Sequence, residues 1–342
     1  MNILFIILPI VTHSLLVNPF LNHWHCIGIQ EKINFEKPFS FNVGDLSLIL
    51  WKNDKEKDSF SSTINICKHM GSKLDHSQIT KDGCLKCPYH GLEYSSENKK
   101  DVIGKTILHE GKLFWSYKPL KNKPEYIPFY NHPNYEKSFL EIEMPCSLQD
   151  SAYNTMDLLH PEYVHNNLFG FGNSIPPKNV IFYDYNNTQN ITPNIGLSFD
   201  YYSKSIVTKG FTQTDNFHLF VYPSFSWSRV SFEKNHLYIG VNLLPTGIKK
   251  TKWYITVCHN FYKKSWEKQM LKMMAVSILT QDYIQMKNQA IETNLKKAIL
   301  FNKKFENEEP VLRLNRYFTD CYKYVDMNDC VNLYDDYKNS LP

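Results

Sequence analysis

Two short groups of metal-binding side chains lie in the first third of this sequence. The first joins Cys67 to His69 and the second joins Cys87 to His90, so each offers one thiolate and one imidazole. A zinc finger normally presents both thiolates from one turn and both imidazoles from another. Two mixed pairs instead suit a [2Fe-2S] cluster with one iron held by two Cys and the other by two His. This order predicts an electron relay, with a zinc site as the alternative.

A second set of metal-binding residues lies in the stretch 148–165, whose pattern predicts a helix. It comprises Asp157, His160 and His165, and two imidazoles with a carboxylate leave coordination positions on Fe(II) free for O₂ and water. The two histidines are five residues apart, which is about 140° around a regular helix. Pro161 lacks a backbone N–H and can break or widen the turn, so we expect a local distortion that brings both rings together.

The first set resembles the fingerprint of the Rieske non-haem iron oxygenases. C-x-H-x-G-x-x-L at 67–74 and C-P-x-H-G-x-x-Y at 87–94 are similar to that fingerprint, with Leu92 where Trp is usual. The glycines after each pair allow the tight turns that two loops around one cluster need. The resemblance implies a Rieske [2Fe-2S] cluster with four ligands, namely Cys67, His69, Cys87 and His90.

The second set is similar to the iron motif N-x-x-D-x-x-H-x-x-x-x-H of the same family. The motif is matched by Asn154, Asp157, His160 and His165. The resemblance implies that the two histidines bind a mononuclear Fe(II) with O₂ as co-substrate, and it makes Asn154 and Asp157 catalytic residues.

In this family the carboxylate ligand comes from a C-terminal helix, where the matching residue is Asp282. The Glu that often precedes this Asp is Gln281 here. Glu267 and Glu292 lie on the same predicted helical stretch, 262–301, and are rival ligands that we expect to be solvated instead.

The resemblance also implies an assembly. In related enzymes the residue that matches Asp157 links a cluster histidine of one subunit to an iron histidine of its neighbour, which implies a homo-trimer with electron transfer between chains. A carboxylate that accepts hydrogen bonds from both imidazoles would fix their tautomers.

The elements that position these residues predict an α+β protein. Short apolar runs between residues 23 and 119 indicate a small all-β module, and the proline-containing stretch 121–133 indicates a linker. Strands are expected from 180 to 259 and a long or broken helix from 262 to 301. We expect an N-terminal segment at 1–21, a Rieske domain at 22–120, a linker at 121–135 and a catalytic domain at 136–342, which the resemblance implies to have a helix-grip (START-like) fold.

Composition narrows the class of protein. The 342 residues are 42% hydrophobic, 15% aromatic and 21% charged, with a formal net charge of +4 and scattered lysines. These values describe a folded globular protein and disfavour nucleic acid as a partner. The sequence has no flavin or nicotinamide fingerprint, so we expect a separate ferredoxin or flavin reductase to supply electrons.

The first residues allow two interpretations. Residues 3–11 form an apolar run of the length of a signal-peptide core, but no Lys or Arg precedes it, and it is too short to span a membrane. In the first interpretation it is a targeting or membrane-surface segment, which would suit a plastid or membrane-associated protein. In the second it packs on the folded domain, which would suit a cytoplasmic protein.

We therefore expect a Rieske oxygenase that acts on a small hydrophobic organic molecule. Segments 87–95, 157–176 and 316–324 are similar to the chlorophyllide a and pheophorbide a oxygenase group, which implies a chlorophyll-type tetrapyrrole. A sterol or an aromatic ring would suit an aromatic-rich domain as well. A Rieske electron-transfer protein without oxygenase activity, or a binding module with degenerate metal sites, stays open.

Overall fold

The computed structural model describes residues 19–54, 58–168, 175–184, 194–205, 210–289 and 311, without the side chains of 175, 176, 184, 203–205, 210 and 211. Most of the predicted segment 1–21 and the rival ligand Glu292 lie outside these residues. Phe20 and Leu21, at the end of that segment, are buried. Among the described residues we found no helix both long and apolar enough to cross a membrane.

The N-terminal part is built from three small antiparallel sheets, ordered β1-β9-β8, β2-β3-β4 and β5-β6-β7. Short 3₁₀ turns at Pro19–Asn22 and Gln30–Lys32 flank β1. The strands are β1 (His25–Ile29), β2 (Phe39–Val43), β3 (Leu46–Asp54), β4 (Ser59–Ile64), β5 (Gln78–Ile79), β6 (Leu85–Lys86), β7 (Glu93–Tyr94), β8 (Lys105–His109) and β9 (Lys112–Ser116). The all-β expectation for this part is confirmed.

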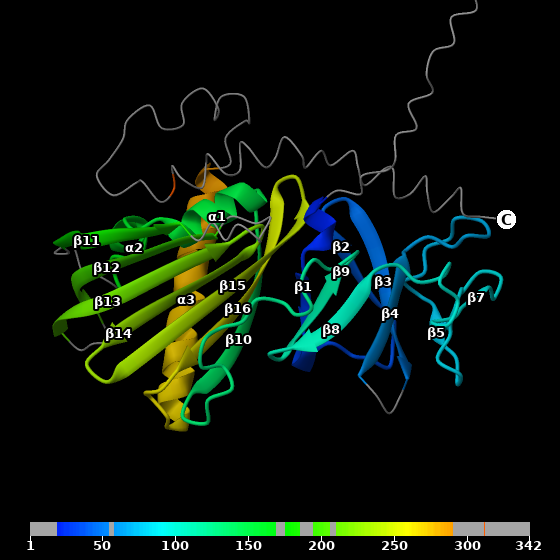
Figure 1. The fold of residues 1–342 in the computed structure, drawn as a ribbon, viewed down its shortest axis with the longest axis horizontal. Coiled ribbons are helices and arrows are strands. Elements are labelled where there is room, and N and C mark those ends of the chain that lie inside the picture. The colour runs from blue at the N-terminus through cyan, green and yellow to red at the C-terminus, as the bar shows by residue number, and fades with distance from the viewer. Residues whose placement is uncertain are drawn as a thin grey trace, which may run out of the picture.

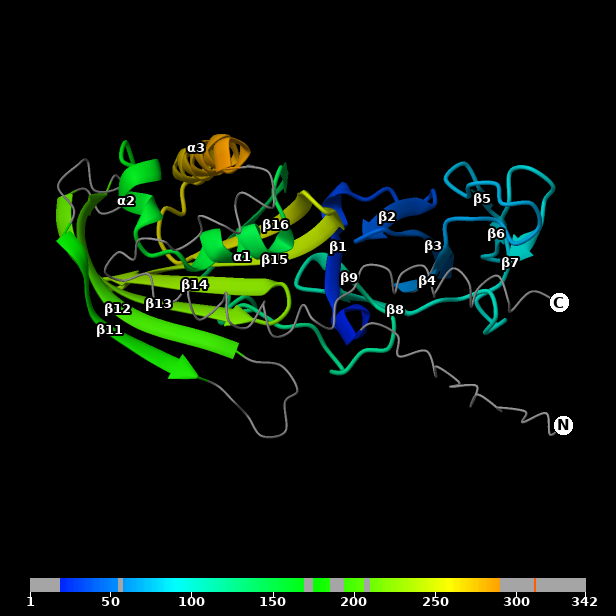
Figure 2. The same ribbon diagram turned by 90° about the horizontal axis from the view of Figure 1, so that it is seen from above.

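The C-terminal part is one seven-stranded antiparallel sheet with helices on one face (Figures 1 and 2). Its strand order is β10-β16-β15-β14-β13-β12-β11. The strands are β10 (Glu136–Met144), β11 (Ile175–Asp184), β12 (Asn194–Ser205), β13 (Gly210–Val221), β14 (Phe225–Phe232), β15 (Asn235–Gly247) and β16 (Lys250–His259), and the helices are α1 (Leu148–Met156), α2 (His160–Val164) and α3 (Ser265–Gln289). The α+β expectation is therefore confirmed.

Strand β16 shows how the two parts are held together. Nine of its ten residues are not exposed, because the strand is covered on both faces. Trp253 donates from its indole N–H to Ser151 of α1 at 2.9 Å, whereas the next residue, Tyr254, donates its hydroxyl to the Ile27 carbonyl of β1 at 2.7 Å. Since successive side chains of a strand point to opposite faces, one strand packs on the helices and on the N-terminal part at once.

The site-bearing helix differs from its sequence prediction. The stretch 148–165 is two helices, and the chain bends between Asp157 and Leu159, before Pro161. Pro161 lies in the first turn of α2, a position where the missing N–H is unpaired in any helix. The distortion is therefore real, but Pro161 begins a new helix and does not widen the old one. The division of the chain at 121–135 stays a prediction, and that stretch contains no helix or strand.

Candidate functional site: two groups of metal-binding residues

The two Cys–His groups form matching loops. In the first, the Gly71 N–H donates to the Cys67 carbonyl at 2.9 Å, and in the second the Gly91 N–H donates to the Cys87 carbonyl at 3.1 Å. Both glycines have positive φ, +72° and +74°, a conformation that other residues adopt with strain. The glycine spacing noted in the sequence thus builds the same turn twice.

These loops bring the four predicted cluster ligands together at one end of the molecule. Cys67 and Cys87 are buried, each 3% exposed, and their thiols are hydrogen-bonded. The rings of His69 and His90 lie on the exposed side with centroids 4.8 Å apart. Two buried thiols and two exposed imidazoles fit a [2Fe-2S] cluster in which one iron is held by two Cys and the other by two His.

The surroundings of Cys67 favour a thiolate. Burial alone would raise the pKa of this thiol, but hydrogen bonds from the Tyr94 hydroxyl, the His69 backbone and the Cys87 thiol outweigh it, so the pKa is lowered. The Tyr94 oxygen in turn accepts the Lys68 N–H at 2.8 Å. Because the thiolate is the form that binds metal, these donors fit the cluster.

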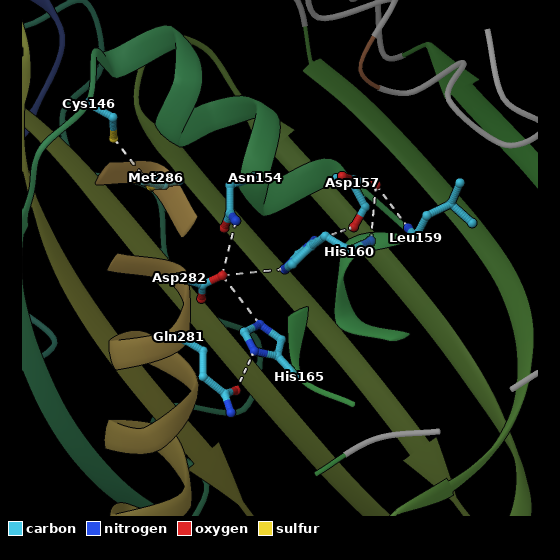
Figure 3. A network of polar contacts seen from close by, with 9 residues as sticks. All are labelled: Cys146, Asn154, Asp157, Leu159, His160, His165, Gln281, Asp282 and Met286. Carbon is cyan, nitrogen blue, oxygen red and sulfur yellow. Dashed lines mark hydrogen bonds and ion pairs between the residues drawn. The ribbon is translucent and has the colours of Figure 1, made fainter. Parts of the chain in front are cut away.

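The two predicted iron histidines and the predicted carboxylate ligand come together beside α3 (Figure 3). His160, His165 and Asp282 place one ligand atom each within 4.8 Å of one another. The Asp282 Oδ1 lies 3.3 Å from Nε2 of His165 and 3.8 Å from Nε2 of His160. We searched the described residues for groups of at least three His, Cys, Asp or Glu whose ligand atoms lie this close together. His160, His165 and Asp282 are the one such group among them.

Burial explains why this group fits a cation. Asp282 is 4% exposed and His165 is 2% exposed, and burial lowers the pKa of His160, which favours its neutral form. A buried carboxylate beside a neutral imidazole lacks a full counter-charge, and buried charges are normally paired or bound to metal. Two imidazoles and one carboxylate are the donor set that non-haem Fe(II) takes.

The bend between α1 and α2 also orients His160. In a continuous helix, residue 161 would donate to the carbonyl of Asp157, but Pro161 has no N–H to give. The His160 ring fills this place, since its Nδ1–H donates to the Asp157 carbonyl at 2.9 Å. The Nε2 lone pair is therefore left facing Asp282.

The other motif residues lie beside the group. Asn154, on α1, donates from Nδ2 to the Asp282 Oδ1 at 3.1 Å. Within the chain, the carboxylate of Asp157 makes no hydrogen bond to the rings or the carboxylate of this group; its Oδ1 accepts the backbone N–H of Leu159 at 2.9 Å and of His160 at 3.4 Å. Asp157 thus holds the first turn of α2 in place. Glu267 lies in the first turn of α3 and accepts the Lys264 N–H at 3.0 Å, away from the three-residue group.

Gln281 has a role that sequence reasoning missed. Its Oε1 accepts the Nδ1–H of His165 at 2.8 Å, which fixes the tautomer and turns Nε2 toward Asp282 (Figure 3). In the sequence it was only a departure from the Glu that the family often has before its Asp. Its position next to the predicted ligand was the one signal available.

Replacing Gln281 by alanine should weaken iron binding at this group by roughly 10–100-fold, because such outer partners orient a metal-binding histidine. Gln281→Glu should bind iron at least as well as the unsubstituted chain, since a carboxylate accepts the same hydrogen bond. Iron content after dialysis against a graded chelator measures both. Gln285→Ala, one turn along α3, is the control, and equal iron retention in Gln281→Ala and Gln285→Ala would contradict the orienting role.

Comparison with known proteins agrees with this geometry. Residues 23–105 match the model of the Rieske [2Fe-2S] domain. Pheophorbide a oxygenase of Oryza sativa is 21% identical over 44% of this chain and 34% of its own length. The dicamba O-demethylase oxygenase component of Stenotrophomonas maltophilia is 25% identical over 42% of this chain and 47% of its own length. The cholesterol 7-desaturase of Caenorhabditis elegans is 24% identical over 43% of this chain and 39% of its own length. The matched parts span about a third to a half of these curated relatives.

The fold agrees over a longer stretch. The crystal structure of dicamba monooxygenase bound to dicamba superposes with a TM-score of 0.73 at 15% identity, over 89% of this chain and 98% of that one. A caffeine-bound structure of Pseudomonas putida NdmA superposes with a TM-score of 0.69 at 13% identity, over 87% of this chain and 90% of that one. Residues 23–105 are thus a Rieske [2Fe-2S] domain, and the chain's homologues and structural neighbours are Rieske oxygenases.

Proposed function

We propose that this chain is the oxygenase component of a Rieske non-haem iron oxygenase, which oxygenates a hydrophobic organic substrate with O₂ and electrons from a separate ferredoxin or flavin reductase. The observation that supports this most is the buried carboxylate of Asp282 beside the imidazoles of His160 and His165. A Rieske protein that only transferred electrons would have no use for a second metal group outside residues 23–105.

The residues around the second group have separable tasks. When bound, the ferrous ion supplies the coordination positions at which O₂ reacts, and the [2Fe-2S] cluster supplies electrons. Gln281 and Asn154 hold the His165 ring and the Asp282 carboxylate in place. The side chain of His160 is 18% exposed, whereas those of His165 and Asp282 are 3% and 5% exposed. Access for a substrate is therefore from the His160 side.

For the substrate we propose a flat hydrophobic molecule, of which a chlorophyll-type tetrapyrrole is the first candidate and a sterol or an arene the alternative. The support is that pheophorbide a oxygenase and two chlorophyllide a oxygenases are among the relatives, together with a cholesterol desaturase and a dicamba demethylase. Plastid location is proposed on the same basis, because the pheophorbide a and chlorophyllide a oxygenases among these relatives are chloroplastic.

Anaerobic reconstitution followed by O₂-uptake assays tests the function. We expect three irons per chain, the EPR signal of a reduced Rieske cluster and substrate-dependent O₂ uptake with chlorophyllide, pheophorbide, a sterol or an arene, with product mass increased by oxygen or with loss of a methyl group. Two irons per chain and no uptake would favour the electron-transfer alternative. A colourless, iron-free protein would favour the binding module.

We further propose that the chain works as a ring of copies, in which the cluster of one subunit serves the iron of the next. Figures 1 and 2 place the β5–β7 end, which carries the cluster loops, and α2 at opposite ends of the molecule. Exposed apolar side chains surround the cluster histidines, with Met70 64%, Tyr89 62% and Leu92 39% exposed. A neighbouring subunit that covers this end would bury them. A trimer with 120° symmetry closes such a ring.

Asp157→Asn separates the bridging role from the local one. Asparagine can still accept the N–H groups of Leu159 and His160, so stability should change by less than about 0.5 kcal/mol and both metals should stay, whereas Asp157→Ala should lose about 1 kcal/mol. Loss of the charge should slow cluster-to-iron electron transfer roughly 10–100-fold, measured by single-turnover absorbance. If Asp157→Asn turns over normally, the bridging role is wrong.

A further inference from the structure

A third histidine lies under the helices and takes no part in holding a metal. His218 is on β13, where Leu197 of β12 and Ser228 of β14 are its register partners. It is hydrogen-bonded to the backbone of Thr155 on α1, so its side chain is on the helix-covered face of the sheet. Its other ring nitrogen, Nδ1, is buried and has no hydrogen-bond partner among the described residues.

The Thr155 contact decides which nitrogen bears the proton. A carbonyl oxygen only accepts, so the bonded nitrogen, Nε2, must donate, and in a neutral ring Nδ1 is then an acceptor. Burial, and to a smaller extent His160, lowers the pKa of His218 to about 4, so the ring is neutral at pH 7. His218 therefore holds an unused acceptor inside the catalytic part of the chain.

This acceptor lies under the helix that also carries a partner of the metal-binding group. The Thr155 partner of His218 is next to Asn154, which donates to Asp282, and His160 is the most exposed of the three candidate ligands. His218 as a residue is half-buried, whereas its Nδ1 is buried. The Phe199 ring packs edge-on at 5.1 Å and makes the wall beside it apolar.

We propose that His218 positions the substrate by accepting a hydrogen bond at Nδ1, and that the substrate bears an O–H or N–H donor near the carbon that reacts. This rests on the proposed oxygenase function and narrows its substrate class. A buried polar atom without a partner is unfavourable, and a ligand that supplies the missing donor removes this cost. A donor-bearing molecule should bind roughly 10-fold to 100-fold tighter than one of the same shape without the donor.

The test compares two probes of nearly equal shape, indole, which has one N–H donor, and benzofuran, which has none. Their dissociation constants are measured by calorimetric titration into the holoenzyme with both metals loaded. His218→Gln keeps an amide that can reach Thr155 but has no acceptor at the Nδ1 position, whereas His218→Asn places an amide oxygen close to that position. His132→Gln, at an exposed histidine, is the control.

We expect indole to bind at least about tenfold tighter than benzofuran in the unsubstituted protein and in His132→Gln. The ratio should fall near one in His218→Gln and recover in part in His218→Asn, with iron content unchanged in all four. A ratio near one in the unsubstituted protein, a ratio retained in His218→Gln, or no binding of either probe overturns the proposal. If substrate-dependent O₂ uptake persists in any of these cases, the proposed function stands while His218 loses its role. Absence of the mononuclear iron overturns both.

Discussion

Replacing Asp282 by alanine should remove the mononuclear iron and bring turnover to background, while the cluster spectrum stays unchanged. The carboxylate is the charged member of the three-residue group, and it is buried where His160 and His165 both present Nε2 to it. Two imidazoles alone would keep a divalent ion in a buried place without charge compensation. We expect the affinity for the mononuclear iron to fall by more than about a hundredfold, which is more than the loss expected for Gln281→Ala.

The control for this change is Glu267→Ala on the same helix. Glu267 holds a backbone N–H at the start of α3, so its loss should lower stability by about 1 kcal/mol and leave the iron in place. Iron per chain by elemental analysis, Rieske EPR after reduction and O₂ uptake distinguish the two variants. Retention of one mononuclear iron in Asp282→Ala would show that another carboxylate is the ligand.

Replacing Cys87 by serine should abolish the Rieske cluster, with its visible absorbance and its EPR signal, and with it all electron delivery to the iron group. The Cys87 thiol is buried against the Cys67 thiol, and a serine hydroxyl is a far poorer ligand for cluster iron than a thiolate. Because the cluster loops lie on the end distant from α2, iron binding by His160, His165 and Asp282 should survive.

Cys84 provides a matched control three residues away. It is half-buried and its thiol takes no part in the two matching loops. Cys84→Ser should keep the full absorbance and EPR signal of the reduced cluster. A colourless Cys84→Ser protein, or a coloured Cys87→Ser protein, would mean that the cluster ligands are assigned to the wrong cysteine.

The elements themselves could be predicted in part. Alternating and apolar runs predicted the β-rich N-terminal part and the strands between 180 and 259, because these patterns follow from the two faces of a strand. The strand β10 was not foreseen, although residues 139–144 partly alternate apolar and charged side chains, because it directly follows the proline-rich stretch. The break at Asp157–Leu159 was anticipated and attributed to Pro161, which begins the second helix.

The sequence by itself determined the types and local order of the metal-binding residues. Each pair of predicted ligands lies within one short segment. The turns of the two Cys–His pairs depend on neighbouring glycines, and the turn of the pair His160 and His165 depends on Pro161. Such local motifs can be recognised without knowing what packs against them. Their assignment as ligands stays a prediction that the experiments above test.

Tertiary structure alone decided which distant side chains complete the second group. Asp282 is 128 residues from Asn154 and Gln281 is 116 from His165, and they meet because α3 crosses the sheet face that α1 and α2 also cover. His218 reaches this place from β13 through the register of the sheet. Contacts over such separations depend on the packing of the whole sheet, which no short motif encodes.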